Sequence, residues 1–240
     1  MGTGKAGFRM KITLKMEFSF MNVIEITALN KRVEEKKILE NVSLNLEGGR
    51  AYKLLGGNGC GKTTLIKCIL GILEYDSGII KRYVGTQNYE IRQKELFKYF
   101  SVYFADTALP KNLKVCECID LFKIVNEYND NENELLDFFQ IKSLLNKKYG
   151  VLSTGEKNII LLLTTLLSNW KVLILDEPFI GLDSEMKTKM GEFLRCSKDT
   201  DRTIIIVSHE DDGEFVGEDF YDSFIDGNNG FALCNTKYNS

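Results

Sequence analysis

Eight consecutive residues carry the clearest chemistry in the chain. Residues 56–63 read Gly-Gly-Asn-Gly-Cys-Gly-Lys-Thr and match the pattern G-x-x-x-x-G-K-[ST] in full. Several backbone N–H groups must meet the phosphate oxygens at once, so the chain has to turn tightly with no Cβ in the way, and glycines permit that turn. Lys62 would carry a positive charge to the β- and γ-phosphates, and the Thr63 hydroxyl would ligate Mg²⁺. The residues expected to contact a nucleotide are Gly57, Asn58, Gly59, Cys60, Gly61, Lys62, Thr63 and Thr64.

An apolar run that ends in two acids lies farther along the chain. Residues 171–178 read Lys-Val-Leu-Ile-Leu-Asp-Glu-Pro, so Asp176 and Glu177 directly follow a predicted strand. In open α/β sheets, ligands bind at the carboxyl ends of the strands. Asp176 would hold Mg²⁺ through water, and Glu177 would polarise the water that attacks the γ-phosphate. A polar turn after a strand is common by itself, and the phosphate loop is what favours the catalytic interpretation.

A second apolar run, residues 203–207, is followed by Ser208 and His209. His209 is the only histidine in the chain. A lone histidine is usually structural or simply exposed. One that follows a buried parallel strand is a better candidate for a group that senses the γ-phosphate, and we therefore place His209 with the catalytic residues.

The segments around these residues alternate between strand and helix patterns. The glycine loop lies between a predicted strand and a predicted helix, which makes a chance glycine turn improbable. All-apolar runs predict strands that are covered on both faces of a parallel sheet. Helical periodicity without strands between about 106 and 150 predicts a small helical lobe. The predicted strands are 23–29, 38–46, 51–55, 100–104, 172–175 and 203–207, the predicted helices are 62–73, 115–126, 132–145 and 153–167, and a hairpin is expected over 224–233.

Composition limits the remaining possibilities. A chain of 240 residues with 44% hydrophobic residues suits one large α/β domain, and a net charge of −3 argues against nucleic acid as a partner. The six cysteines have no CxxC spacing, so reduced thiols are expected rather than a zinc site. The longest apolar run, residues 159–167, is much shorter than the about 20 residues that a membrane span needs. We expect residues 1–20 to be a disordered extension.

Two further motifs resemble those of a known protein family. Residues 152–156 read Leu-Ser-Thr-Gly-Glu, which resembles the Leu-Ser-Gly-Gly-Gln signature of ABC (ATP-binding cassette) ATPases, and residues 181–183 resemble their D-loop. The motif order from Gly56 to His209 is similar to that of the family, and the resemblance covers about residues 22–235. It implies an α/β fold of the P-loop NTPase class. This fold has a RecA-like, mostly parallel sheet, an antiparallel β subdomain and an inserted α-helical subdomain at about 106–165, all within a cassette domain at 21–240. The motif set is unlike that of kinases, GTPases and helicases.

The resemblance also implies how such a chain works. Cassettes of this family act as head-to-tail dimers, in which ATP on one phosphate loop is capped by the signature segment of the other subunit. Ser153 and Gly155 would therefore bind the γ-phosphate in trans, in a homodimer or a pseudo-dimer of cassettes. The cofactors implied are ATP and Mg²⁺. The helical lobe would contact a separately encoded transmembrane permease subunit, which places the chain in the cytoplasm, peripheral on the inner face of the cell membrane.

The leading interpretation is thus the ATP-hydrolysing subunit of an ABC transporter. The Gly-Leu-Asp form of the D-loop and the compact length favour export. The alternatives are a soluble ABC ATPase that does not serve transport, for example one for iron–sulfur cluster assembly, and a slow ATP-dependent regulator. Retention of Glu177 argues against the regulator.

Two positions depart from the family pattern. A glutamine is expected after the strand that enters the helical lobe, and Ala105 stands there, followed by Asp106. An aromatic residue that stacks on adenine is expected near position 33, where the chain has Arg32 and Val33. Stacking would then be absent or supplied by the Arg32 guanidinium plane. These departures lower the expected rate of turnover but not the expectation of ATP binding.

Overall fold

The computed structural model describes residues 22–85, 89–128, 132–198, 202–208, 213–217 and 219–234. The predicted N-terminal extension at 1–20 and the candidate sensor His209 lie outside these ranges.

A six-stranded sheet forms the centre of the molecule, in the order β10-β9-β3-β8-β7-β6. Every neighbouring pair from β9 to β6 is parallel, and only β10 runs antiparallel, as the second strand of the expected C-terminal hairpin. The strands are β3 (Ala51–Leu55), β6 (Phe100–Phe104), β7 (Val172–Asp176), β8 (Thr203–Val207), β9 (Ser223–Asp226) and β10 (Ala232–Cys234). This confirms the predicted mostly parallel core.

The register of this sheet aligns the strand ends that carry the candidate chemistry. Val207 of β8 lies opposite both Leu54 of β3 and Asp176 of β7, and Asp176 in turn lies opposite Phe104 of β6. All residues of β7 and β8 are buried, as expected for apolar strands covered on both faces. The segments that follow these strands therefore leave the sheet along one edge.

A second, antiparallel sheet covers one side of the core, in the order β2-β1-β4-β5. Its strands are β1 (Asn22–Val33), β2 (Lys36–Glu47), β4 (Ser77–Val84) and β5 (Tyr89–Glu90). The first two were predicted, and the sheet agrees with the antiparallel subdomain that the family resemblance implied. Apolar side chains of this sheet pack with helix α1 (Lys62–Ile69) and with one face of β7 and β8 into a single cluster.

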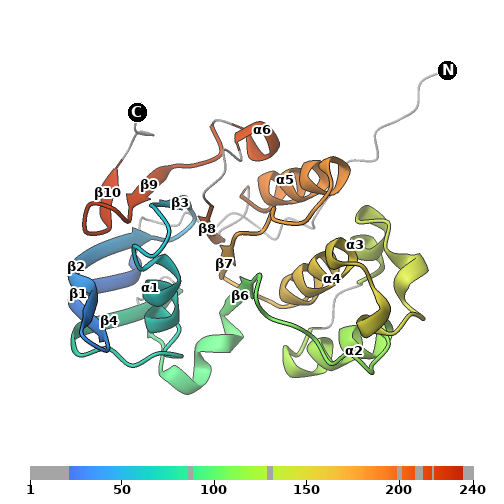
Figure 1. Ribbon diagram of the computed structural model, residues 1–240, viewed down its shortest axis with the longest axis horizontal. Coiled ribbons are helices and arrows are strands. Elements are labelled where there is room, and N and C mark those ends of the chain that lie inside the picture. Colours follow the sequence, from blue (N-terminus) through green and yellow to red (C-terminus); the bar gives the residue numbers. More distant parts are fainter. Residues whose placement is uncertain are drawn as a thin grey trace.

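The chain between β6 and β7 is largely helical, as the sequence predicted, and Figure 1 shows α2, α3 and α4 gathered on the side of the parallel strands away from β1 and β2. The helices are α2 (Val115–Val125), α3 (Asn133–Phe138) and α4 (Thr154–Leu166), with two 3-10 helices, η2 (Lys142–Leu144) and η3 (Tyr149–Val151), between α3 and α4. They share a second apolar cluster with the other face of the sheet and with α5 (Ser184–Lys198). The short helix α6 (Gly213–Val216) follows β8, and the 3-10 helix η1 (Gln93–Lys98) precedes β6.

Two predicted helices end earlier than expected. The helix expected over 62–73 ends at Ile69, because Gly71 adopts a left-handed φ of +64° and the Ile72 N–H turns back to the Lys67 carbonyl. The helix expected over 132–145 ends at Phe138 for the same reason. Gln140 has a φ of +56°, and the Ile141 N–H donates to the Leu136 carbonyl. A glycine in the sequence indicates a helix end of this kind, whereas a glutamine does not.

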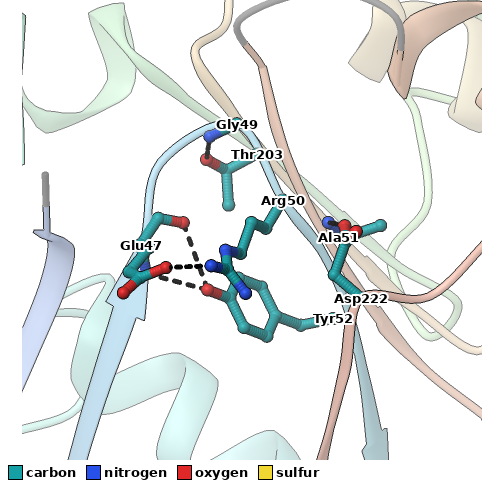
Figure 2. A network of polar contacts seen from close by, with 7 residues as sticks. All are labelled: Glu47, Gly49, Arg50, Ala51, Tyr52, Thr203 and Asp222. Atoms are coloured by element: carbon teal, nitrogen blue, oxygen red, sulfur yellow. Dashed lines mark hydrogen bonds and ion pairs between the residues drawn. The ribbon is translucent and has the colours of Figure 1, made fainter. Parts of the chain in front are cut away.

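The ends of the strands opposite the candidate site are tied together by a polar network, shown in Figure 2. The buried Tyr52 hydroxyl accepts from the Glu47 N–H at 2.8 Å, while the Arg50 guanidinium contacts the Glu47 carboxylate at 2.6 Å. The Gly49 N–H donates to Thr203 Oγ1 at 3.0 Å. Asp222 completes the network by accepting from the Ala51 N–H at 2.7 Å. These contacts fix β3 against β8 and β9, and so fix where β3 delivers the loop that follows it.

None of the helices in the described part of the chain combines the length and the hydrophobicity that crossing a bilayer requires.

Candidate functional site

The glycine loop leaves β3 and turns directly into α1, as the motif predicted. Gly56, Gly59 and Gly61 all have positive φ, and Gly61 is the residue from which α1 begins. A left-handed φ is strained for residues with a Cβ, so the loop conformation itself depends on these glycines. The loop therefore presents backbone N–H groups at the N-terminal end of α1, where a phosphate group is favoured.

Two side chains at the start of α1 are held in defined positions. The Lys62 ammonium donates to the carbonyls of Gly56 at 2.6 Å and Gly57 at 3.0 Å. The Thr63 hydroxyl donates to Asp176 Oδ2 at 2.9 Å. This last bond joins residues that are 113 positions apart in the sequence. The phosphate loop and the acidic end of β7 are thus one site.

Both segments line a common cleft of about 510 Å³. The loop and α1 contribute Asn58, Gly59, Gly61, Lys62, Thr63 and Thr64, and the ends of β6 and β7 contribute Ala105, Asp106, Asp176, Glu177 and Ile180. Lys36 and Ile38 of β2 close the remaining side. Eight of the predicted nucleotide, metal and catalytic residues meet here, whereas Gly57 and Cys60 belong to the same loop but do not line the cleft. The lining offers ammonium and backbone N–H groups that can bind phosphates, and carboxylate and hydroxyl oxygens that can ligate a metal ion.

The two acids at the end of β7 differ in their surroundings. Asp176 is buried, and burial raises the pKa of its carboxyl, while the Thr63 hydroxyl and the Lys62 charge oppose that rise and Asp106 adds to it. Glu177 adopts a left-handed φ of +57°, and its N–H donates to the Val207 carbonyl of β8 at 2.8 Å. The positive φ turns the chain sharply at the end of β7, so that Glu177 stands beside Asp176 on the wall of the cleft. Such strained conformations are common at active sites.

The signature segment forms the start of α4 and lies elsewhere. Ser153 caps the helix through a reciprocal pair of bonds, in which its hydroxyl accepts from the Glu156 N–H at 3.2 Å and its own N–H donates to Glu156 Oε2 at 2.8 Å. Ser153 and Gly155 line a second cleft of about 380 Å³ between the segment that follows α3, the start of α4 and the start of α5. This cleft shares no described residue with the phosphate cleft. Within one chain, Ser153 and Gly155 therefore line a different cleft from the one that the phosphate loop lines.

The D-loop lies against this signature helix. The Asn158 side chain donates to the Ile180 carbonyl at 3.0 Å, and a Cβ on Gly155 would lie 2.9 Å from the Gly181 carbonyl. Asp183 then caps α5 by accepting from the Met186 N–H at 2.8 Å. Ile180 lines the phosphate cleft, so this short segment connects the two clefts.

The structure locates the two positions at which the sequence departs from the family pattern. Ala105 lines the cleft with only a methyl group, and Asp106 follows it there. Arg32 and Val33 end β1 and do not line the described cleft, and the backbone N–H of Arg32 donates to the Asp76 carboxylate. The expectation that Arg32 supplies a stacking surface therefore receives no support from the structure. The cleft wall on that side is formed by Lys36 and Ile38, which the sequence did not single out because nothing in their types marks them as ligand contacts.

Comparison with known proteins agrees with this geometry. A family model described as ABC transporter matches residues 39–180, more than half of the chain. The sulfate/thiosulfate import ATP-binding protein CysA of Pectobacterium atrosepticum is 31% identical over 205 residues, covering 78% of this chain and 59% of the relative. The Nod factor export ATP-binding protein I of Burkholderia thailandensis is 30% identical, covering 78% of this chain and 62% of the relative. The chain thus spans about three fifths of the length of these relatives.

A solved structure described as the ATP-binding subunit of an ABC transporter superposes with a TM-score of 0.73 at 25% identity and covers 85% of both chains. The fold of the chain is therefore that of the ABC ATPase subunits, as expected from the motifs. The chain therefore belongs to the ABC transporter family, and it is an ATP-binding ATPase cassette of that family.

Proposed function

We propose that this chain binds ATP in the cleft between the phosphate loop and the end of β7 and hydrolyses it there to drive transport through a separate membrane subunit. The observation that carries the proposal is the 2.9 Å bond between Thr63 and Asp176, which brings the two halves of the predicted site together. Gly57 to Thr64 would cradle the phosphates, and Lys62 would turn from the loop carbonyls to the β- and γ-phosphates. His209 is proposed as the sensor of the γ-phosphate.

The donor set in the cleft fits Mg²⁺. Thr63 and Asp176 offer two adjacent hard oxygen donors, and Mg²⁺ is usually bound by one or two protein oxygens together with substrate phosphates and water. The described lining also holds three carboxylates, Asp106, Asp176 and Glu177, against the two ammonium groups of Lys36 and Lys62. A triphosphate would add further negative charge to this cleft. Mg²⁺ held by Thr63 and Asp176 would neutralise that charge when bound.

Glu177 is the proposed general base. It stands on the cleft wall next to Asp176, within the same lining as the loop that would hold the γ-phosphate. Its carboxylate would accept a proton from the attacking water as the water oxygen bonds to the γ-phosphorus and the bond to the bridging oxygen of ADP breaks. Lys62 and the loop N–H groups would stabilise the charge on the transferred group.

The separation of the two clefts supports completion of the site in trans. Ser153 and Gly155 line a different cleft from the phosphate loop of their own chain, and we propose that they contact the γ-phosphate on a second cassette. The N-terminal end of α4, capped by Ser153, would then face the phosphate. We therefore propose an ATP-dependent homodimer or pseudo-dimer, with ATP sandwiched between the loop of one subunit and the signature segment of the other.

The membrane partner and the direction of transport rest on the family. The helices between β6 and β7 are the proposed contact for a transmembrane permease subunit, which would hold the chain as a peripheral protein on the cytoplasmic face of the cell membrane. Export rests only on the form of the D-loop and on the chain length, since the relatives include both an import and an export protein by name.

The test uses the Glu177→Gln variant. If the proposal holds, the variant binds ATP with parent affinity, loses hydrolysis by about 100-fold or more, and forms an ATP-dependent dimer by light scattering that Ser153→Arg prevents. Normal hydrolysis by Glu177→Gln would show that the base lies elsewhere. The same variant, tagged and recovered from its host in mild detergent with ATP, should carry a polytopic membrane protein. Recovery of soluble partners alone would refute the transport role and favour a non-transport ABC ATPase.

A further inference from the structure

The turn of the C-terminal hairpin touches the phosphate loop directly. The Gly57 N–H, at the second position of the loop, donates to Asn228 Oδ1 at 2.9 Å. The two residues are 171 positions apart, and Asn228 belongs to the turn between β9 and β10. Asn228 lies outside every motif that marks the nucleotide site in the sequence.

The position of Asn228 is fixed by its neighbours. Asp226, the last residue of β9, lies opposite Leu55, the last residue of β3, in the parallel pairing of these strands. The Gly227 N–H then donates to the Leu55 carbonyl at 2.7 Å, and the Asn228 N–H donates to Asp226 Oδ1 at 2.9 Å. The turn is thus an extension of the sheet, and the amide of Asn228 is held by the same strands that deliver the loop.

The two segments also approach at backbone contact. A Cβ on Gly227 would lie 2.7 Å from the Leu55 carbonyl and 3.0 Å from Cys60 Sγ, and a Cβ on Gly56 would lie 3.2 Å from Gly227 Cα. Real side chains essentially never come as close as the first of these distances. The hairpin turn therefore packs against Gly56, Gly57 and Cys60, none of which lines the described cleft.

The bond from Asn228 reaches the part of the loop that holds the lysine. The Lys62 ammonium is bound by the carbonyls of Gly56 and Gly57, and Asn228 fixes the N–H of the same Gly57. Gly57 itself does not line the described cleft, and its N–H is bonded to Asn228. A loop rich in glycine loses much conformational freedom when it is ordered, and a contact that orders it before the ligand arrives raises affinity.

We propose that Asn228 is a positioning residue, which holds the phosphate loop in its nucleotide-binding conformation before ATP arrives. The proposal rests on the nucleotide site proposed above. Asn228 acts through Gly57 and does not contact the substrate. Its loss should lower the fraction of molecules with a competent loop, which raises the apparent dissociation constant by the same factor. Once ATP is bound, the loop is ordered by the phosphates, and turnover at saturation should be nearly unchanged.

The experiment compares Asn228→Ala with Asn229→Ala in the full chain. Asn229 is the same residue type at the next position and is exposed, and no side-chain bond from it to the loop occurs among the described residues. We expect Asn228→Ala to raise the KM and the calorimetric Kd for Mg-ATP by about three- to tenfold, with kcat within about twofold of the parent. Asn229→Ala should match the parent in both. Asn228→Asp keeps an acceptor at the same place, and at about 0.3 M salt, where its charge is screened, it should recover most of the affinity.

Three results would overturn the proposal. Unchanged KM and Kd in Asn228→Ala would show that the bond does not order the loop. Tighter ATP binding would show that Asn228 competes for an N–H that the phosphate needs. A parallel fall in kcat and in melting temperature would show that the turn merely supports the fold. If the parent chain itself fails to bind ATP, the proposed nucleotide site fails first, so the two failures are distinguishable.

Discussion

Replacement of Gly61 by alanine tests whether the loop conformation, and not only its charge, creates the nucleotide site. Gly61 has a φ of +103°, which is strained for alanine, and a Cβ there would lie 3.0 Å from both the Ile38 Cγ2 and the Ile38 carbonyl. The left-handed backbone costs about 1–2 kcal/mol for a residue with a Cβ. The overpacking against β2 adds about 1–3 kcal/mol, because a backbone carbonyl cannot move aside as a side chain can.

Gly49 provides the matched control for this substitution. It also has a positive φ, +74°, but a Cβ there would meet no atom within 4 Å. It lies in the network at the opposite end of β3, so Gly49→Ala carries the backbone strain without the contact and without proximity to the cleft. Both variants should unfold at lower temperature than the parent, and Gly61→Ala should lose about 1–3 kcal/mol more than Gly49→Ala. In a chain of this size, this difference corresponds to roughly 2–12 °C in Tm.

Thermal unfolding and ATP titration calorimetry measure the two consequences separately. Gly49→Ala should bind Mg-ATP with parent affinity. Gly61→Ala should bind about tenfold more weakly or worse, because the loop can no longer direct its N–H groups to one phosphate. If Gly61→Ala is as stable as Gly49→Ala and binds ATP normally, the close approach of the loop to β2 has no energetic consequence, and the reasoning from geometry to affinity is refuted.

Three other predictions follow from the contacts described. Lys62→Ala should lower ATP affinity by about 10- to 100-fold, since a charge-assisted contact is lost, and near-parent affinity by calorimetry would contradict the loop assignment. Ser153→Ala removes the cap of α4 and should cost about 1 kcal/mol, or about 2–4 °C by differential scanning fluorimetry, while ATP binding by the isolated chain stays unchanged. Burial raises the pKa of Tyr52 from 10.0 to about 12, so the folded state favours the neutral phenol more than the unfolded state does. The contribution of Tyr52 to stability should therefore be complete below pH 10 and fall as the pH rises from 10 toward 12. Denaturant titrations of Tyr52→Phe should show a shallower fall, to which Tyr103, whose pKa burial also raises to about 12, still contributes.

The central strands and the phosphate loop could be predicted because the residue types that their positions in the fold require are visible in the local sequence. β7 and β8 are buried on both faces, so they are apolar except for Asp176 at the end of β7 and Thr203 at the start of β8. A run of apolar residues that ends in polar ones marks both the strand and the sheet edge where ligands bind. The glycine pattern is equally constrained, since the left-handed φ at Gly59 and Gly61 excludes most other residues. The fold of the core and the two halves of the phosphate cleft were therefore within reach of the sequence.

Other features have no local mark. Helix α5 carries many charged residues, and β4 includes Lys81 and Arg82, so neither shows the apolar pattern from which the other elements were predicted. The end of α3 depends on a left-handed glutamine, Gln140, which only the folded chain reveals. The contact between Asn228 and Gly57 joins residues across most of the chain length, and an asparagine in a hairpin turn is explained equally well by the turn itself.

The strand register explains why Ala105 and Asp106 stand in the cleft where a glutamine is expected. Phe104 lies opposite Asp176, so the two residues that follow Phe104 must enter the cleft beside the acidic end of β7. Ala105 brings only a methyl group there, and Asp106 brings a carboxylate that raises the pKa of Asp176 further, in addition to the larger effect of burial. The Asp106 carboxylate thus adds to the negative charge at the end of β7 that a cation bound by Asp176 would neutralise.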